Sequence, residues 1–496
     1  MIGAVNGAVS GPACGVPSDS VRWRRVHPLT PVLQSWQVIV VLLVIIAQEL
    51  GQNLTQGEVP GGRSLPRLGG WMLAGGGLVL VVLLVVIGLF AYLSWRFTRY
   101  RVTSEALELQ QGVLSRKFRQ APLDRVQAVD LAQPVLARIV GLARLTLEVA
   151  GGSDSRIQLA YLSETEAHQL RNHLLAAAAG VRYETEEAPE APEHFDVTVP
   201  VGRLIGSILL SGLTVWIVVV AAGFAVAAVV AGSGGILAAA LPVALGGGGA
   251  LWQRFAAGFG FRVATASDGL RLRHGLLEHR TQTVPPGRVQ AVKIHQPLLW
   301  RLRSWWVVEV NVAGYGGDKE GAAPSNLLLP VGTRDEAVAV LSFVLPDLGV
   351  EKELPGVVVD AGLTGSGTDG GFVSAPRRAR WVDPIGWSRE GFRLTSNALL
   401  VRRGVLHREL DVVPHARTQS CGVTQGPLQR KLGLASFALH STAGPVSPKV
   451  DHLSSDVAAG LLMDQVARAR SARAVAGPER WMERSDPLQK PPERPE

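Results

Sequence analysis

Arg125-Val126-Gln127-Ala128-Val129 and Arg288-Val289-Gln290-Ala291-Val292 are the same five residues, 163 positions apart in the chain. A third, diverged copy begins at Arg417, where the sequence reads Arg417-Thr418-Gln419. Each of these arginines has a proline three positions before it, a glycine thirteen positions before it and a glutamine eight positions after it. The residues at these offsets are Pro122, Pro285 and Pro414; Gly112, Gly275 and Gly404; and Gln133, Gln296 and Gln425. Recurrence at several fixed offsets identifies an internal repeat, so the chain is built from three copies of one unit.

The first part of each copy has the pattern of β-strands. Apolar residues alternate with polar ones before Gly112, Gly275 and Gly404, which is the spacing of a half-buried strand. Each glycine permits a turn into a second strand, so we expect a hairpin there. The same alternation continues from Pro122 to Val129, and β-branched or aromatic runs follow. Five or more strands per copy are predicted.

The end of each copy has the pattern of a helix. Ser163-x-x-Glu166 and Thr333-x-x-Glu336 match the capping box, in which a hydroxyl and a carboxylate satisfy free amides at a helix start. Apolar residues then recur with helical spacing. The third copy follows this plan more weakly, with Ser454 or Ser455 as the cap. The order of elements is therefore several strands and then one helix.

The composition is that of a membrane protein. Among 496 residues, 47% are hydrophobic and only 18% are charged, and the mean hydropathy is +0.21. These values are too apolar for a water-soluble protein of this length. The two cysteines, Cys14 and Cys421, allow at most one disulfide, which excludes a disulfide-stapled secreted scaffold.

Four apolar stretches are long enough to span a bilayer, and they lie at residues 32–48, 71–95, 204–232 and 235–252. Ser233 and Gly234 alone join the last two, which predicts a helical hairpin. None of the four has a charged residue at its centre, whereas transporters and pumps usually place ionisable groups there. The pattern favours anchoring spans over a conduit.

Arginines beside the spans predict the orientation. Arg22, Arg24 and Arg25 precede the first pair, and Arg96, Arg99 and Arg101 follow it. Arg203 and Arg254 flank the second pair. Because Lys and Arg are retained on the cytoplasmic side, we expect a multi-pass plasma-membrane protein whose N-terminus and large domains are cytoplasmic.

The Pro-x-x-Arg-x-Gln element, followed by Gln-Pro or by Gln425-Gly426-Pro427, resembles the bacterial pleckstrin-homology (PH) domains of YdbS/YdbT-like membrane proteins. The resemblance covers most of the chain between residues 21 and 470. It implies three PH-like domains, each a bent antiparallel β-sandwich or partial barrel capped by a C-terminal helix. It also implies a membrane hairpin before each domain, and the third hairpin is absent from this sequence.

We therefore expect an α+β membrane protein with four transmembrane helices in two hairpins and three PH-like domains. The predicted boundaries are an N-terminal cytoplasmic segment at 1–30, hairpin 1 at 31–95, PH-like domain 1 at 96–179, an acidic linker at 180–203, hairpin 2 at 204–252, PH-like domain 2 at 253–346, a Gly-rich linker at 347–380, PH-like domain 3 at 381–473 and a disordered tail at 474–496.

The third domain carries the positive charge of the chain. Residues 376–475 contain 15 Lys or Arg against 7 Asp or Glu, and the Gly362 to Gly371 run before them is typical of a flexible linker. Anionic inner-leaflet lipids attract such a segment, and Trp387 could lie at the interface. The alternative is a solvated basic surface on an ordinary domain.

The repeated polar residues Arg125, Gln127, Arg288, Gln290, Arg417 and Gln419 are the candidate binding residues. Arginine could bind phosphate, such as a lipid headgroup, or it could tie its strand to neighbouring loops. Recurrence in all three copies favours the structural interpretation.

The sequence offers no catalytic or metal-binding motif. His407, His415, His440 and His452 are irregularly spaced, and Cys421 lies on an expected buried strand as a packed thiol. The Gly365-x-Gly367-x-x-Gly370 string lacks the following helix of a dinucleotide site. We expect no catalytic residue, no metal and no cofactor.

The function implied by this reading is a non-catalytic scaffold or sensor that binds lipid headgroups or proteins at the membrane and helps the envelope respond to stress. Expected partners are anionic lipids and either other proteins or further copies of the chain. Nucleic acid is not expected, because the basic segment lacks a recognition helix and base-stacking aromatics. A transport or export assembly and a lipid-modifying enzyme are the competing interpretations.

Overall fold

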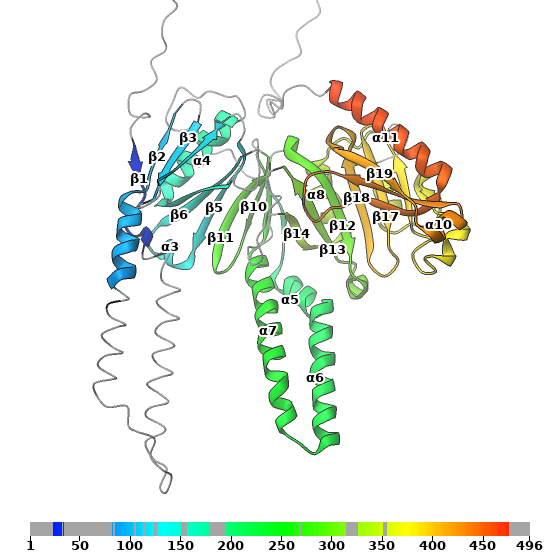
Figure 1. Cartoon of the computed structure of the whole chain (residues 1–496), viewed down its shortest axis with the longest axis horizontal. Helices are drawn as coiled ribbons and strands as arrows, with labels where there is room; N and C mark the ends of the chain where they lie inside the picture. The colour runs from blue at the N-terminus through cyan, green and yellow to red at the C-terminus, as the bar shows by residue number, and fades with distance from the viewer. Residues whose placement is uncertain are drawn as a thin grey trace, which may run out of the picture.

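The computed structural model describes residues 23–31, 33, 82, 85–103, 106–112, 116–123, 126–149, 156–178, 194–266, 269–284, 286–313, 326–350 and 355–475. Within them, three β-rich units stand in a row, and a helical hairpin projects from the middle unit (Figure 1). Each unit has four strands, then three more, and ends in a helix. This order agrees with the predicted plan of strands followed by one helix.

The seven strands and the terminal helix of each unit correspond one to one with those of the other units. Unit 1 contains β1 (Arg24–Arg25), β2 (Arg99–Val102), β3 (Ala106–Gln111), β4 (Lys117–Pro122), β5 (Val126–Pro134), α3 (Val135–Ile139), β6 (Leu142–Val149), β7 (Arg156–Ser163) and α4 (Glu164–Ala178). Unit 2 contains β8 (His194–Thr198), β9 (Arg262–Ala266), β10 (Gly269–His274), β11 (Glu278–Val284), η2 (Pro286–Arg288), β12 (Val289–Gln296), η3 (Leu298–Arg303), β13 (Trp306–Val312), β14 (Leu327–Gly332) and α8 (Arg334–Val344). Unit 3 contains β15 (Val373–Ser374), η5 (Arg377–Trp381), β16 (Gly391–Leu394), β17 (Ala398–Arg403), β18 (Arg408–Pro414), η6 (His415–Arg417), β19 (Ser420–Thr424), α10 (Pro427–Lys431), β20 (Leu434–His440), β21 (Lys449–Ser454) and α11 (Ser455–Val475).

The sheets do not stop at the unit boundaries. The last three strands of unit 1 and the first four of unit 2 form one seven-stranded sheet in the order β7-β6-β5-β11-β10-β9-β8. Units 2 and 3 share a second, in the order β14-β13-β12-β18-β17-β16-β15. Sequence patterns suggested independent domains, whereas edge-strand pairing joins neighbouring units into one row.

The two seams between units have the same register. In the first, Gln133 of β5 lies opposite His279 of β11. In the second, Gln296 of β12 lies opposite Arg408 of β18. Gln133 and Gln296 are repeat counterparts, and His279 and Arg408 each follow their hairpin glycine, Gly275 or Gly404, by four positions. The contact between units is therefore as regular as the units themselves.

The membrane hairpin is inserted inside its unit, between the first two strands. Helices α6 (Gly212–Ala231) and α7 (Gly235–Gly258) lie between β8 and β9, which pair with each other. Strand β8 lies in the segment predicted as the acidic linker 180–203, so this linker prediction is wrong at its C-terminal end. In the part of the chain that the structure describes, α6 and α7 are the two helices long and apolar enough to span a bilayer. The first predicted pair lies largely outside the described residues, which include from it Leu33, Val82 and the helix at Val85–Arg96.

The span predicted at 204–232 is divided into two helices. Helix α5 (Val201–Leu209) ends before Ser211, whose side chain accepts a hydrogen bond from the Thr214 amide and so caps α6. Leu204 and Ser207 of α5 are buried, and the Trp300 indole donates to the Ser207 carbonyl over 3.0 Å. The first turns of the predicted span therefore belong to the packed β-domain.

The predicted flexible linker 347–380 is wrong where the structure describes it. It contains helix α9 (Pro355–Leu363), whose Val358, Val359 and Leu363 are buried, and the turn η4 (Asp369–Gly371). Two buried arginines, Arg389 and Arg402, donate to backbone carbonyls of this segment. Glycine content predicted flexibility, but the carbonyls that glycine leaves accessible bind arginine instead.

The predicted capping boxes differ between units. Thr333 and Glu336 form the complete box at the start of α8. In unit 1 the Glu166 amide does donate to Ser163, at 3.3 Å, but the Glu166 carboxylate accepts from the Tyr100 hydroxyl at 2.7 Å. Burial, together with this contact, raises the pKa of Tyr100.

Candidate functional site

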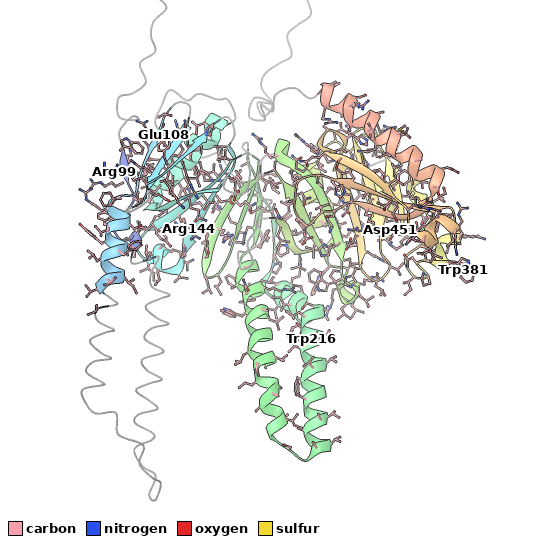
Figure 2. The ribbon with its side chains drawn as sticks, in the orientation of Figure 1. Arg99, Glu108, Arg144, Trp216, Trp381 and Asp451 are labelled. Atoms are coloured by element: carbon pink, nitrogen blue, oxygen red, sulfur yellow. The ribbon has the colours of Figure 1, made fainter. Side chains whose placement is uncertain are left out.

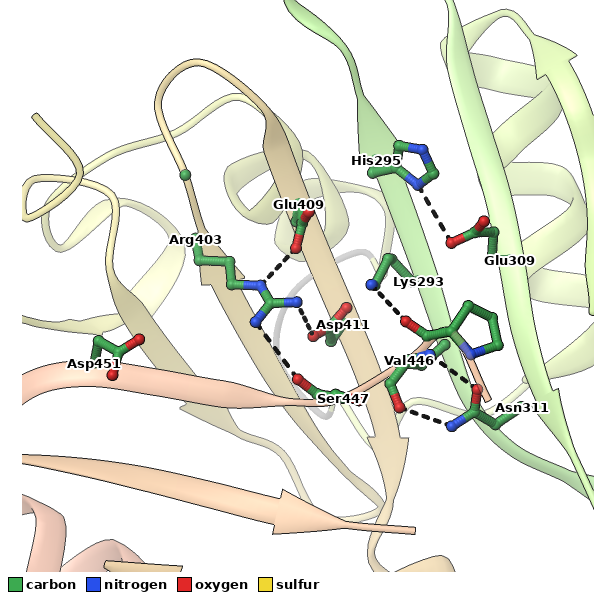
Figure 3. A network of polar contacts seen from close by, with 12 residues as sticks. Lys293, His295, Glu309, Asn311, Arg403, Glu409, Asp411, Val446, Ser447 and Asp451 are labelled. Atoms are coloured by element: carbon green, nitrogen blue, oxygen red, sulfur yellow. Dashed lines mark hydrogen bonds and ion pairs between the residues drawn. The ribbon is translucent and has the colours of Figure 1, made fainter. Parts of the chain in front are cut away.

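The seam between units 2 and 3 contains a buried polar network (Figure 3). Lys293 of β12 donates to the Pro445 carbonyl at 2.7 Å, which reaches across from unit 3. Arg403 pairs with Glu409 at 2.6 Å and with the fully buried Asp411 at 3.5 Å. Lys293 and Asp411 are direct neighbours in the strand register. The network thus joins charged groups from both units.

Asn311 forms a clamp at this seam. Its Nδ2 donates to the Val446 carbonyl at 2.7 Å, and its Oδ1 accepts from the Val446 amide at 2.9 Å (Figure 3). Asn311 lies on β13 of unit 2, and Val446 lies between β20 and β21 of unit 3. Because Asn311 is fully buried, both hydrogen bonds are protected from competition by water.

Burial determines the protonation of this network. It raises the pKa of Asp411 to about 6, although Arg403 acts in the opposite direction. It lowers the pKa of His295 to about 4, so this imidazole is neutral at pH 7. The groups are held inside the seam rather than presented to a substrate, which fits a structural role.

Asp411→Asn should stabilise the protein above pH 6. The folded-state pKa of about 6 lies above the ordinary 3.8, so ionisation opposes folding and stability falls as the pH rises through 6. The uncharged amide removes this cost, which is about 3 kcal/mol for a pKa difference of two units. We expect a higher midpoint of thermal unfolding in detergent at pH 8 and none of the gain near pH 4. Asp464→Asn, at an exposed carboxylate, is the control; a lower midpoint for Asp411→Asn at pH 8 would contradict the assignment.

The predicted binding residues do not gather into one site in the described part of the chain. Arg125 and the side chain of Gln127 lie outside the described residues. The Gln290 amide donates to the Arg288 carbonyl at 3.3 Å, and Gln419 is exposed. Arg417 donates to the Gly287 carbonyl at 2.5 Å, from unit 3 to unit 2. This hydrogen bond ties Arg417 to a neighbouring loop, which is the role that the structural interpretation gives to the repeated arginine.

In units 2 and 3, the repeated glutamine of the Gln-Pro element closes a local loop, whereas the buried Nε2 of Gln133 in unit 1 has no hydrogen-bond partner among the described residues. Gln296 donates to the Trp305 carbonyl at 3.2 Å, and Gln425 donates to the Leu434 carbonyl at 2.8 Å. Both contacts span nine residues. The fixed spacing of this glutamine in the sequence was a signal for this structural role, and no ligand has to be assumed to explain it.

The repeated alanine marks the seam. Ala128 of unit 1 belongs to the hydrophobic core of unit 2, and Ala291 of unit 2 belongs to the core of unit 3. Both are fully buried. The third copy has the exposed Ser420 at this position, at the start of β19, which is an edge strand of its sheet among the described residues.

A second candidate surface lies where the hairpin leaves the units. We call it the hairpin-side surface and define it by α3, η3 and the β10–β11 and β17–β18 turns, together with α10 and residues 375–390. Helix α10 is the counterpart of α3 and η3 in unit 3, and Arg378 joins residues 375–390 to it through a hydrogen bond to the Gly433 carbonyl at 3.1 Å. Backbone hydrogen bonds join the β10–β11 turn to the end of α7, from Gly275 to Phe259 at 2.8 Å and from Leu276 to Ala256 at 2.8 Å. Val135 at the start of α3 donates to Leu277 of the same turn at 2.9 Å. The Arg301 side chain of η3 reaches the Leu406 carbonyl in the β17–β18 turn at 3.0 Å.

This surface exposes apolar side chains beside arginines. Large exposed apolar residues on it are Leu136, Ile139, Val140, Leu277, Leu298, Leu302, Leu406 and Leu428. Arg138 and Arg303 lie among them and are exposed. Apolar residues mixed with cations are typical of protein surfaces that contact a lipid headgroup region.

In unit 3, residues 375–390 occupy the chain position at which unit 2 has its hairpin, between the first and second strands. Trp381 is 71% exposed there and Ile385 is 60% exposed. Figure 2 shows Trp381 at the far end of the row and Trp216 on the hairpin. Arg377 and Arg380 are exposed beside Trp381.

The most exposed tryptophan of this segment is not the one singled out from the sequence. Trp387 is partly buried against the small cluster of Ala375, Ala379 and Leu434. Trp381 is six residues earlier and is the exposed one. Periodicity could not separate the two, because the segment is a turn whose packing depends on unit 3 as a whole.

The sequence matches the bacterial PH domain family over residues 41–178, 203–346 and 359–469. A Bacillus subtilis (strain 168) protein described as UPF0699 transmembrane protein YdbT is 24% identical over 312 residues, which are 56% of this chain and 62% of that protein. The aligned part of the chain thus spans less than two thirds of this relative's length. No solved structure matches the chain.

Proposed function

The chain belongs to the bacterial PH domain family, and from that premise we propose that it is a non-catalytic membrane platform whose three units lie along the cytoplasmic leaflet and bind anionic lipid headgroups. We propose four spans in two hairpins, with the units and the N-terminus in the cytoplasm. The arginines that flank the spans support this orientation.

The observation that carries the proposal is that unit 3 has residues 375–390 at the position where unit 2 has its hairpin. Unit 2 reaches the bilayer through α6 and α7, which leave it between its first two strands. Unit 3 has at the same place an exposed tryptophan, an exposed isoleucine and exposed arginines. Tryptophan partitions into the interface, and each arginine near an anionic surface contributes about 1 kcal/mol. Unit 3 would thus rest on the leaflet that anchors its neighbour.

The test uses the intact chain, because the first strands of unit 3 share a sheet with unit 2. A nitroxide label at Trp381→Cys in a Cys14→Ser, Cys421→Ser background is reconstituted into vesicles that contain phosphatidylglycerol. On binding to these vesicles, we expect the label to collide more often with oxygen and less often with a water-soluble nickel chelate, as for a site within the headgroup region. A label at Met463→Cys on the exposed face of α11 is the matched control and should remain accessible to nickel.

Reversing the charges in Arg377→Glu/Arg380→Glu should withdraw the label at position 381 from the bilayer without changing the label at 463. Both arginines are exposed, so folding should be unaffected. A label at 381 with the same accessibility in phosphatidylglycerol and in purely zwitterionic vesicles, or one fully accessible to nickel in both, would overturn headgroup binding by unit 3.

A further inference from the structure

We propose that this chain assembles head to tail with further copies of itself, through pairing of β19 of one copy with β4 of the next. The contact would repeat the two seams inside the chain. It does not depend on lipid binding by unit 3, and it makes the row of three units a segment of a longer row.

The two edges are the free ends of the pattern. Inside the chain, the fifth strand of a unit pairs with the fourth strand of the following unit, as in β5 with β11 and β12 with β18. Strand β19 is the fifth strand of unit 3 and β4 is the fourth strand of unit 1. Among the described residues, each is the last strand of its sheet. They lie at opposite ends of the row (Figure 1).

The internal seams fix the register that such a contact would have. Val292 lies opposite Val412, and Ile294 lies opposite Leu410. Their counterparts by position from the repeated arginine and glycine are Cys421 with Gln120, and Val423 with Phe118. The pairing therefore places Val423 beside Phe118.

Side-chain exposure differs between the internal and terminal edges. Leu410, at the seam of units 2 and 3, is fully buried, and Thr281 at the first seam is 6% exposed. Phe118 is their counterpart on β4 and is 57% exposed. A large aromatic side chain on an open strand edge is a site for strand addition. A second copy would cover it with Val423, which lies on β19 beside the core of unit 3.

Charge on β4 does not prevent this pairing, because the internal seams also carry charge. Arg280 lies opposite Ala132 in the first seam, and Glu409 lies opposite His295 in the second. Lys117 is the counterpart of Arg280 and Glu409, and it would lie opposite the uncharged Thr424. The contact requires no buried pair of like charges.

The membrane permits such a row. The helix at Val85–Arg96 leaves unit 1 on the side from which α6 and α7 leave unit 2 (Figure 1). A further copy added at β19 by the same step would keep its helices on this side. A head-to-tail contact of this kind gives either a closed ring or an open row in the plane of the bilayer.

The native cysteine provides the test. One tagged copy carries Cys14→Ser, Cys421→Ser and Gln120→Cys, and a second, differently tagged copy carries only Cys14→Ser and so retains Cys421. Both are expressed together, and their membranes are oxidised with copper phenanthroline, which accepts the two electrons released when two thiols form a disulfide. We expect a heterodimer on a non-reducing gel that a reductant dissolves.

Lys117→Cys in place of Gln120→Cys is the matched control. It lies on the same strand but out of register with Cys421, so its cross-linking should be several-fold weaker, and pairing it with Thr424→Cys should restore the product. Adding Phe118→Asp to the Gln120→Cys copy should remove the heterodimer. No heterodimer with Gln120→Cys, equal yields from positions 117 and 120, or cross-links only to a different protein would each overturn the proposal.

Discussion

Replacing Arg402 with methionine should lower the free energy of unfolding by about 3–5 kcal/mol, because a buried network of hydrogen bonds to charge is removed. The guanidinium is fully buried and donates to the carbonyls of Arg389 at 3.2 Å, Ala361 at 3.0 Å and Gly367 at 2.6 Å. It also lies 4.5 Å from the centre of the Phe372 ring. Methionine fills similar volume but leaves three carbonyls without these donors.

Two measurements check this expectation. The midpoint of thermal unfolding in detergent should fall, and limited proteolysis should cut the Gly362 to Gly371 run before other sites. Arg430→Met, at an exposed arginine of α10, should change neither. If Arg402→Met left the proteolytic pattern unchanged, the run would be ordered by something other than arginine.

Gly275→Ala should be the second severe substitution. Gly275 has a φ of 109° in the β10–β11 turn, and a Cβ placed on it would lie 2.0 Å from the Glu278 carbonyl oxygen. An L-residue is strained at such a φ, and the backbone oxygen cannot move without breaking the turn. We expect a loss of about 3 kcal/mol or more in stability.

The position of this turn adds a functional consequence. Its backbone is hydrogen-bonded to the end of α7, so a distorted turn should also loosen the junction between unit 2 and its hairpin. Hydrogen exchange should increase in β10, β11 and the last turn of α7. Gly356→Ala is the matched control, since nothing lies within 4 Å of its added Cβ. Equal midpoints of thermal unfolding for the two variants would show that the turn tolerates an L-residue.

The repeat glycines show how far local sequence information reaches. Gly112, Gly275 and Gly404 were predicted to permit turns from their spacing alone, and all three have positive φ values. The capping box at Thr333 and Glu336 was likewise predicted and is confirmed. These features depend on contacts within a few residues of the chain, so a pattern of residue types is enough to identify them.

Arg389 and Arg402 show the limit of local sequence information. The segment at 362–371 looked flexible because it is rich in glycine, yet Arg389 and Arg402, farther along the chain, bind its carbonyls. The exposed Trp381 and the partly buried Trp387 could not be distinguished for the same reason. Partners distant in sequence decide both outcomes, and the sequence alone does not place them.

Residue patterns alone were enough to predict three copies of one β-rich unit of the bacterial PH domain family, each ended by a helix, and an apolar hairpin at α6 and α7. Recurrence, periodicity and capping are local or additive properties, so they can be recognised in the linear sequence. The pairing of β5 with β11 and of β12 with β18, through which the units share their sheets, became apparent only in the folded chain. Strand pairing between units depends on which edges remain uncovered after each unit has folded, and that is a property of the whole row.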